Sequence, residues 1–204
     1  MSHILITGFT PFDGRAVNAS WIAARSLIAN HSTEHILHGL RIPVCWGQPR
    51  ETLLPALERW HPHCIIAMGE GEKGQFKIET LARNQRKSRV DNAGNLPPNT
   101  QIDPLGPATR IGSAPCVALR DALSTAGFPI VVSTDAGAYL CEELLYNLEE
   151  QMAARAELKL VLFVHLPPYG STLQMQGETR KCDENLLRTF TQNLLANCLK
   201  LVKL

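Results

Sequence analysis

Four short apolar runs divide the sequence and alternate with segments of helical character. The runs are HILITGF (3–9), HCIIAMG (63–69), FPIVVST (128–134) and LKLVLFVHL (158–166). Each run is short, rich in Ile and Val, and bounded by turn residues, which is typical of buried strands. Because strands that alternate with helices build α/β folds, the sequence predicts an α/β sandwich with a mainly parallel sheet.

The predicted helices lie between and after these strands. They cover residues 18–30, 50–60, 115–127, 138–156 and 183–204. Two further segments, 70–113 and 167–182, are polar or rich in Gly and Pro, and long loops of this kind are usually functional or disordered. We find no internal repeat, linker or low-complexity tract, so we interpret residues 1–204 as one domain.

Charge and composition narrow the class of partner. Lys and Arg number 20 against 19 Asp and Glu, which gives no reason to expect nucleic acid or an anionic membrane as partner. The N-terminus has no basic region before its short apolar run, and no stretch approaches the roughly 20 apolar residues of a membrane span. We therefore expect a cytoplasmic protein.

The six cysteines are spread over the chain without a CxxC pair. Neither a disulfide framework nor a zinc cluster is expected from this spacing. His31, His35 and His38 have helical spacing, but their segment has the character of loop and strand, which favours a solvated cluster over a metal site. GEGEKG (69–74) matches no phosphate-binding pattern, and its glutamates would repel phosphate. We expect neither a metal nor an organic cofactor.

Cys141 is predicted in the first turn of the helix over 138–156, directly after an apolar strand and a Gly turn. Free backbone N–H groups and the positive end of the helix dipole favour a thiolate there, and the same N–H groups can hold an oxyanion. A thiol at this position is equally compatible with plain packing. The other five cysteines are expected to be small buried hydrophobes or partly exposed thiols.

His165 ends the strand over 158–166 and is a candidate general base and acid, or else a core histidine with satisfied hydrogen bonds. A Cys–His pair needs a third group to orient the imidazole, and Glu79 in KIETLARN is one option. Alone, Glu79 would be interpreted as a solvated charge on a helix. Because parallel strands carry their sites at their carboxyl ends, we expect the loops after all four strands to meet at one edge of the sheet.

Phe9 and Phe12 flank the turn in GFTPFDG (8–14). Core packing is the usual role of such a pair. Two rings on an exposed loop at the end of a strand can also clamp a flat ligand.

Taken together, these motifs resemble the pyroglutamyl peptidase I family of cysteine peptidases, also called pyrrolidone-carboxylate peptidases. ILITGFTPFDGRAVNAS is similar to the N-terminal strand and GFxPF loop of the family, and IETLARNQRKSRVDNAGNLP to the segment with the catalytic Glu. VVSTDAGAYLCEELLY resembles the nucleophile motif, and VLFVHLPPY the histidine motif. The motifs occur in the family's order, at matching intervals, over almost the whole chain.

The resemblance implies a three-layer α/β/α sandwich around a mainly parallel, mixed sheet. It assigns Cys141 as nucleophile, His165 as general base and acid, and Glu79 as the group that orients His165. The remaining implied positions are Arg89 near the oxyanion, Phe9 and Phe12 around the pyrrolidone ring, and Val90 and Leu140 lining the pocket. It further implies a homo-oligomer, either a dimer or a tetramer, with peptides that begin with pyroglutamate as substrates.

Several positions depart from the family pattern. Glu70 replaces a glutamine close to the ring; it can accept the lactam N–H, but a buried charge is costly. Asp135 adds a negative charge near Cys141, and PFDG replaces PFGG. Two alternatives to a pyroglutamyl peptidase therefore stay open. One is a divergent member that cleaves another N-terminal cyclic or acyl amide, and the other is a non-catalytic binding protein on the same scaffold.

Overall fold

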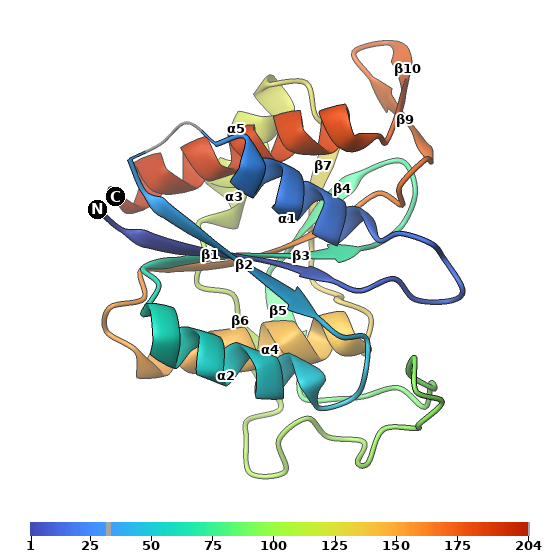
Figure 1. The fold of residues 1–204 in the computed structure, drawn as a ribbon, viewed down its shortest axis with the longest axis vertical. Coiled ribbons are helices and arrows are strands. Elements are labelled where there is room, and N and C mark those ends of the chain that lie inside the picture. The colour runs from blue at the N-terminus through green and yellow to red at the C-terminus, as the bar shows by residue number, and fades with distance from the viewer. Residues whose placement is uncertain (32–33, 204) are drawn as a thin grey trace.

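The computed structural model describes residues 1–31 and 34–203; residues 32, 33 and 204, the last of which ends the predicted C-terminal helix, lie outside this description. Within the described residues a six-stranded sheet has the order β2-β1-β3-β8-β4-β7 (Figure 1). Its strands are β1 (His3–Phe9), β2 (Ile36–Ile42), β3 (Cys64–Glu70), β4 (Phe76–Glu79), β7 (Ile130–Ser133) and β8 (Leu160–Leu166). Two small antiparallel pairs are β5 (Leu81–Arg83) with β6 (Thr109–Ile111) and β9 (Thr172–Met175) with β10 (Glu178–Lys181).

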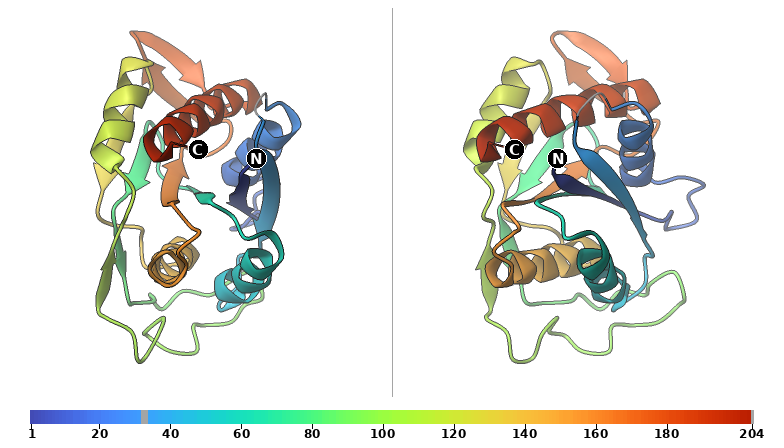
Figure 2. Two further views of the ribbon diagram at one scale, coloured as in Figure 1. Left: turned by 90° about the vertical axis from the view of Figure 1, so that its left-hand side faces the viewer. Right: turned by 60° about the vertical axis from the view of Figure 1, so that its left-hand side comes forward.

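Helices cover both faces of the sheet, which confirms the predicted three-layer sandwich (Figure 2). They are α1 (Ala19–Ala29), α2 (Gln48–Trp60), α3 (Cys116–Thr125), α4 (Leu140–Ala154) and α5 (Glu184–Val202). α1, α3 and α5 pack on one face, and α2 and α4 on the other. None of these helices is both long enough and apolar enough to cross a membrane, as far as the described chain extends.

The strands supply a core to both layers because their side chains alternate between the faces. In β1, Ile4 and Ile6 pack under α1 and α5, whereas Leu5 and Phe9 pack toward α2 and α4. The same alternation divides β3 and β8, which are buried along their whole length. Both faces of the central strands are therefore covered, as their continuous apolar sequence predicts.

Strand direction differs from the expectation at one side of the sheet. β1, β2, β3 and β8 are parallel, but β4 is antiparallel to β8, and β7 is parallel to β4. The expectation that all four predicted strands end at one edge is correct for β1, β3 and β8 and wrong for β7, because the unpredicted strand β4 reverses the direction. The chain turns back before α4 through Gly137 and Ala138, which have φ angles of +91° and +52°.

The long polar segment 81–113 is held along α4 by buried polar side chains of that helix (Figure 1). These side chains bond four separate points of the segment, and the buried polar atoms of the helix thereby gain hydrogen-bond partners. The contacts are Glu142 with the Arg83 N–H (2.6 Å), Glu143 with Arg86 Nε (2.7 Å), the Tyr146 hydroxyl with the Pro107 carbonyl (2.8 Å), and Glu149 with the Ser113 N–H (3.3 Å).

Glu149 should make this attachment depend on pH. Burial raises the pKa of its carboxyl to about 7, against the opposing bonds from Ser113 and the charge of Arg110. The pKa of a Glu carboxyl in the unfolded chain is about 4.3. The stabilisation from neutral Glu149 is therefore complete below that pH and is lost as pH rises through 7.

We expect Glu149→Gln, which stays neutral, to have a free energy of unfolding roughly 1–3 kcal/mol higher than that of wild type at pH 8.5. At pH 5, which is still slightly above the unfolded pKa, most of this advantage should disappear. Urea unfolding of both proteins at the two pH values measures it, and an equal difference at both would contradict the assignment.

Candidate active site

The cysteine thiol singled out by the sequence lies at the start of α4. Cys141 is the second residue of this helix, after the N-cap residue Tyr139, and it is partly exposed. The first N–H groups of a helix have no partner within it, so they stabilise negative charge at this end together with the helix dipole. Just before the helix, the Ala138 N–H donates to the Glu142 carboxylate at 3.0 Å, which fixes the turn that presents Cys141.

His165 and Glu79 form a buried pair between neighbouring antiparallel strands. The distance from His165 Nδ1 to Glu79 Oε1 is 2.8 Å. Lys77 is the direct register partner of His165, and Glu79 lies two residues further along β4, so Glu79 and His165 are diagonal neighbours on one face of the sheet. The carboxylate therefore holds the imidazole in one orientation and fixes a proton on Nδ1. Glu79 belongs to a strand and is 2% exposed, so the alternative of a solvated helix charge is wrong.

Two glycines bring the thiol and the imidazole close together. A Cβ atom at Gly69 would lie 2.7 Å from Cys141 Sγ and 3.2 Å from His165 Cδ2. A Cβ atom at Gly71 would lie 2.8 Å from His165 Cβ. Real contacts are not this short, so the thiol and the ring both rest on backbone that has no side chain.

The electrostatics of the pair favour an imidazolium. Burial by itself lowers the pKa of His165, but its interactions with Cys141 and Glu79 raise it more strongly, to about 10. A protonated imidazole beside the sulfur stabilises the thiolate form of Cys141. The arrangement can therefore hold a nucleophile and an acid ready at neutral pH.

A cavity of about 370 Å³ opens above these side chains. The three catalytic candidates line this cavity. Five of the six residues expected to bind substrate line it as well: Phe9, Phe12, Glu70, Arg89 and Leu140. Val90 does not line it. The residue is 53% exposed, and its carbonyl accepts a hydrogen bond from the Tyr139 hydroxyl at 3.0 Å.

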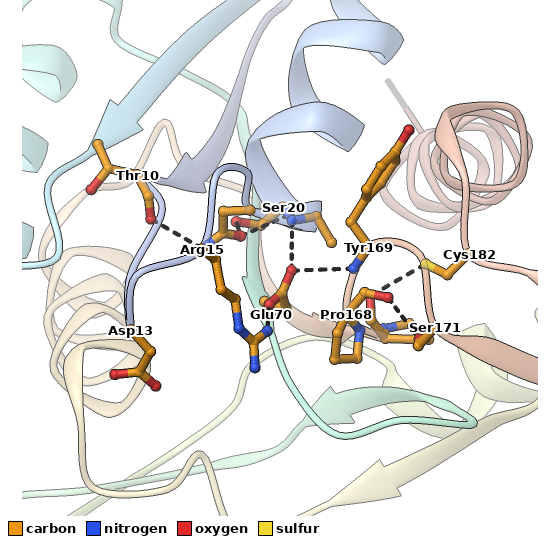
Figure 3. Close-up of polar contacts among 12 residues, drawn as sticks. Thr10, Asp13, Arg15, Ser20, Glu70, Pro168, Tyr169, Ser171 and Cys182 are labelled. Carbon is orange, nitrogen blue, oxygen red and sulfur yellow. Dashed lines mark hydrogen bonds and ion pairs between the residues drawn. The ribbon is translucent and has the colours of Figure 1, made fainter.

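Glu70 is buried, yet its charge is compensated (Figure 3). One carboxylate oxygen pairs with Arg15, and the other accepts the N–H groups of Ala19 at 2.8 Å and Tyr169 at 3.3 Å. Ala19 is the first residue of α1, so the helix dipole adds to the stabilisation. Glu70 thus joins the loop after β1, which carries Phe12, to the turn after β8, which follows His165.

The Arg15–Glu70 pair should stabilise the fold more than an exposed pair does. We expect a double-mutant cycle of Arg15→Gln and Glu70→Gln to give a coupling energy of about 1–3 kcal/mol in urea unfolding, because Glu70 lies in a water-poor site. Arg180 and Glu178, 3.1 Å apart and both well exposed, form the control pair, for which less than about 1 kcal/mol is expected. Equal coupling in the two cycles would contradict a structural role for Glu70.

The two other acidic departures from the family pattern are bound by arginines. Asp13 accepts two bonds from Arg89 Nη2, at 2.6 and 2.5 Å. The Arg89 guanidinium also lies 4.6 Å from the centre of the Tyr139 ring. Asp135 is exposed, accepts the Gly137 N–H at 3.0 Å, and lies 3.4 Å from Arg83. Solvent and these partners screen its charge from Cys141.

Three residues of the site have no prediction from the sequence. They are Arg15, Gly69 and Gly71, although glycines at the end of a buried strand are a recognisable signal of close backbone approach. No local pattern indicates Arg15, because its partner lies 55 residues away in the chain. Within the described residues, no cluster of three or more potential metal ligands occurs.

The chain is similar to known proteins over most of its length. The profile of the pyroglutamyl peptidase family matches residues 2–184. The pyrrolidone-carboxylate peptidase of Pectobacterium carotovorum is 36% identical over 174 residues, which cover 82% of this chain and 79% of that protein. The same enzyme of Pectobacterium atrosepticum is 34% identical with equal coverage.

Solved structures establish the shared fold. Pyroglutamyl peptidase I from Bacillus amyloliquefaciens has a TM-score of 0.85 at 24% identity, covering 97% of this chain and 94% of its own. Pyrrolidone carboxyl peptidase from Thermococcus litoralis has a TM-score of 0.87 at 22% identity, covering 100% and 96%.

An α/β sandwich that brings a thiol at a helix start, an imidazole and a carboxylate together has the arrangement of a cysteine-dependent hydrolase. The family profile and the curated relatives extend over most of the chain. The chain belongs to the pyroglutamyl peptidase family of cysteine peptidases.

Proposed function

We propose that the protein hydrolyses the amide bond after an N-terminal pyroglutamate, with Cys141, His165 and Glu79 as its triad. The observation that carries the proposal is the position of His165. It bonds Glu79 at 2.8 Å, and it approaches Cys141 over Gly69 at one cavity that also contains Phe9 and Phe12.

The cavity suits a neutral five-membered lactam. The side chains of Phe9, Phe12 and Leu140 offer apolar surface to a flat ring, and no group is needed for an α-amine because the ring contains that nitrogen. A carboxylate has about four lone-pair sites, and Glu70 uses three of them for Arg15, Ala19 and Tyr169. One site is left to accept the lactam N–H. Because Arg15 balances its charge, Glu70 is compatible with this neutral ligand.

Acylation begins from the Cys141 thiolate and the His165 imidazolium. The Cys141 thiolate attacks the carbonyl carbon between pyroglutamate and the next residue, and the carbonyl oxygen becomes an oxyanion. Free N–H groups of the first turn of α4 stabilise it, with Arg89 supplying further positive charge from the cavity wall. The His165 imidazolium then gives its proton to the leaving amine as the C–N bond breaks, which leaves a thioester on Cys141.

Deacylation returns the site to its starting state. Neutral His165 takes a proton from water while the oxygen attacks the thioester carbon. The C–S bond breaks, pyroglutamic acid leaves, and Cys141 is again a thiolate beside the His165 imidazolium. Glu79 holds the Nδ1 proton throughout, so that Nε2 is the atom that gives and accepts protons.

Hydrolysis of pyroglutamyl-aminomethylcoumarin under reducing conditions tests the proposal. Prolyl-aminomethylcoumarin is the matched control substrate, because its ring lacks the carbonyl and carries a charged amine. We expect release from the pyroglutamyl compound only. Release from other cyclic or acyl amides instead would favour a divergent specificity, and binding without any turnover would favour a non-catalytic protein.

We also propose a cellular compartment and an oligomeric state for the protein. All six cysteines are free, which supports a reducing compartment such as the cytoplasm. We propose a homo-oligomer, a dimer or a tetramer, on the family resemblance alone; sedimentation equilibrium would measure it.

A further inference from the structure

The charged side chains that line the cavity cancel one another almost completely. Each carboxylate of the lining has a cationic partner, and so do all but one of the cations. The pairs are Arg15 with Glu70, Lys77 with Glu72, Arg89 with Asp13, His165 with Glu79, and Arg83, just outside the lining, with Asp135. Among the described residues, Lys87 is the one charged group of this lining that has no partner of opposite charge.

The backbone of Lys87 is bonded to the turn that precedes the nucleophile. Its backbone N–H donates to the Ala138 carbonyl at 2.8 Å, and Ala138 belongs to the turn that leads into Cys141. Its ammonium group lies 5.6 Å from the centre of the Tyr139 ring. An aromatic face attracts a cation at such a distance, and the exposed Lys87 side chain also lines the open cavity.

Lys87 and the expected ring site have different aromatic neighbours. The Arg89 guanidinium lies 5.9 Å from the Phe12 ring and 4.6 Å from the Tyr139 ring. The Lys87 ammonium lies 5.6 Å from the centre of the Tyr139 ring, whereas Phe12 is one of the two rings expected to hold the lactam. The unpaired ammonium therefore belongs to the wall of the same cavity and lies near Tyr139, the N-cap residue of the helix that carries Cys141.

We propose that Lys87 is a specificity-determining residue that binds a carboxylate on the residue after pyroglutamate. The inference rests on the proposed function and deepens it. The pyroglutamyl group of a substrate has no charge. A carboxylate of the leaving residue is therefore the group that an unpaired cation would attract. Such a carboxylate can be the free α-carboxylate of a dipeptide or the side chain of an acidic second residue.

Two matched substrate pairs separate these sources. Pyroglutamyl-alanine against its amide tests the α-carboxylate, and pyroglutamyl-glutamate amide against pyroglutamyl-glutamine amide tests the side chain. The value kcat/KM is measured for wild type, for Lys87→Met, and for Lys181→Met, which removes an exposed lysine of β10 that is not part of the cavity lining.

We expect wild type and Lys181→Met to prefer the anionic member of at least one pair by about threefold to tenfold. Lys87→Met should lose this preference. Raising the ionic strength from about 0.01 to 1 M, which shortens the Debye length from about 30 to 3 Å, should weaken it in wild type. Equal rates within both pairs, or a preference that persists in Lys87→Met, would overturn the proposal while the proposed function stands. Absence of turnover of any pyroglutamyl substrate by wild type would contradict both.

Discussion

Cys141→Ala is expected to lose at least about a thousandfold in kcat toward pyroglutamyl-aminomethylcoumarin. The variant keeps the cavity, the first turn of α4 and the His165–Glu79 pair but has no atom that can form the thioester. Binding and the remaining oxyanion donors can support only a small residual rate. Initial rates of the purified variant, beside a melting curve that shows it is folded, measure the loss.

Cys45→Ala is the matched control, because Cys45 is a partly exposed cysteine outside the cavity lining. It should retain wild-type rates. In addition, iodoacetamide at neutral pH should label Cys141 before the other five cysteines, four of which are buried. A Cys141→Ala protein with near wild-type turnover would remove Cys141 from the mechanism and leave packing as its role.

Glu79→Gln should cost on the order of a hundredfold to ten-thousandfold in kcat, because the buried charge that orients and stabilises the imidazolium is lost. The amide has nearly the same shape, so substrate binding should change less than kcat. A melting curve again shows whether the variant is folded.

The pH dependence separates this role from a general structural one. The Cys141 thiolate and the Glu79 carboxylate raise the pKa of His165 to about 10, so the imidazolium persists as pH rises toward that value. Removing the carboxylate lowers this pKa, and the alkaline limb of the pH–rate profile should move to lower pH. Glu79→Asp, which keeps the charge, should retain more of the alkaline activity. A Glu79→Gln profile that matches wild type in shape would contradict an electrostatic role.

The strongest sequence signals correspond to the central parts of the fold. The runs that form β1, β3 and β8 are continuous, apolar and buried on both faces, so local composition is sufficient to predict them. Cys141 was recognisable because strand, Gly turn and helix start follow one another directly in the chain. That residues 1–204 form one domain stays a prediction.

Other features depend on contacts that no local pattern contains. β4 is four residues long and follows a Gly-rich turn, and its antiparallel place beside β8 is decided by the sheet. The path of segment 81–113 is fixed by carboxylates of α4, including Glu142 and Glu149, which the sequence alone would expose. Val90 was expected in the pocket from the resemblance, but its backbone rather than its side chain faces Tyr139.

The most direct test of the account is to detect the acyl-enzyme. Wild-type protein is mixed with an activated pyroglutamyl ester, so that acylation outpaces hydrolysis, then quenched in acid and digested for mass spectrometry. We expect one added pyroglutamyl group on the peptide that contains Cys141, and no such addition in Cys141→Ala. An acyl group on a different residue, or the same labelling in Cys141→Ala, would contradict the central claim that the thiol at the start of α4 is the nucleophile.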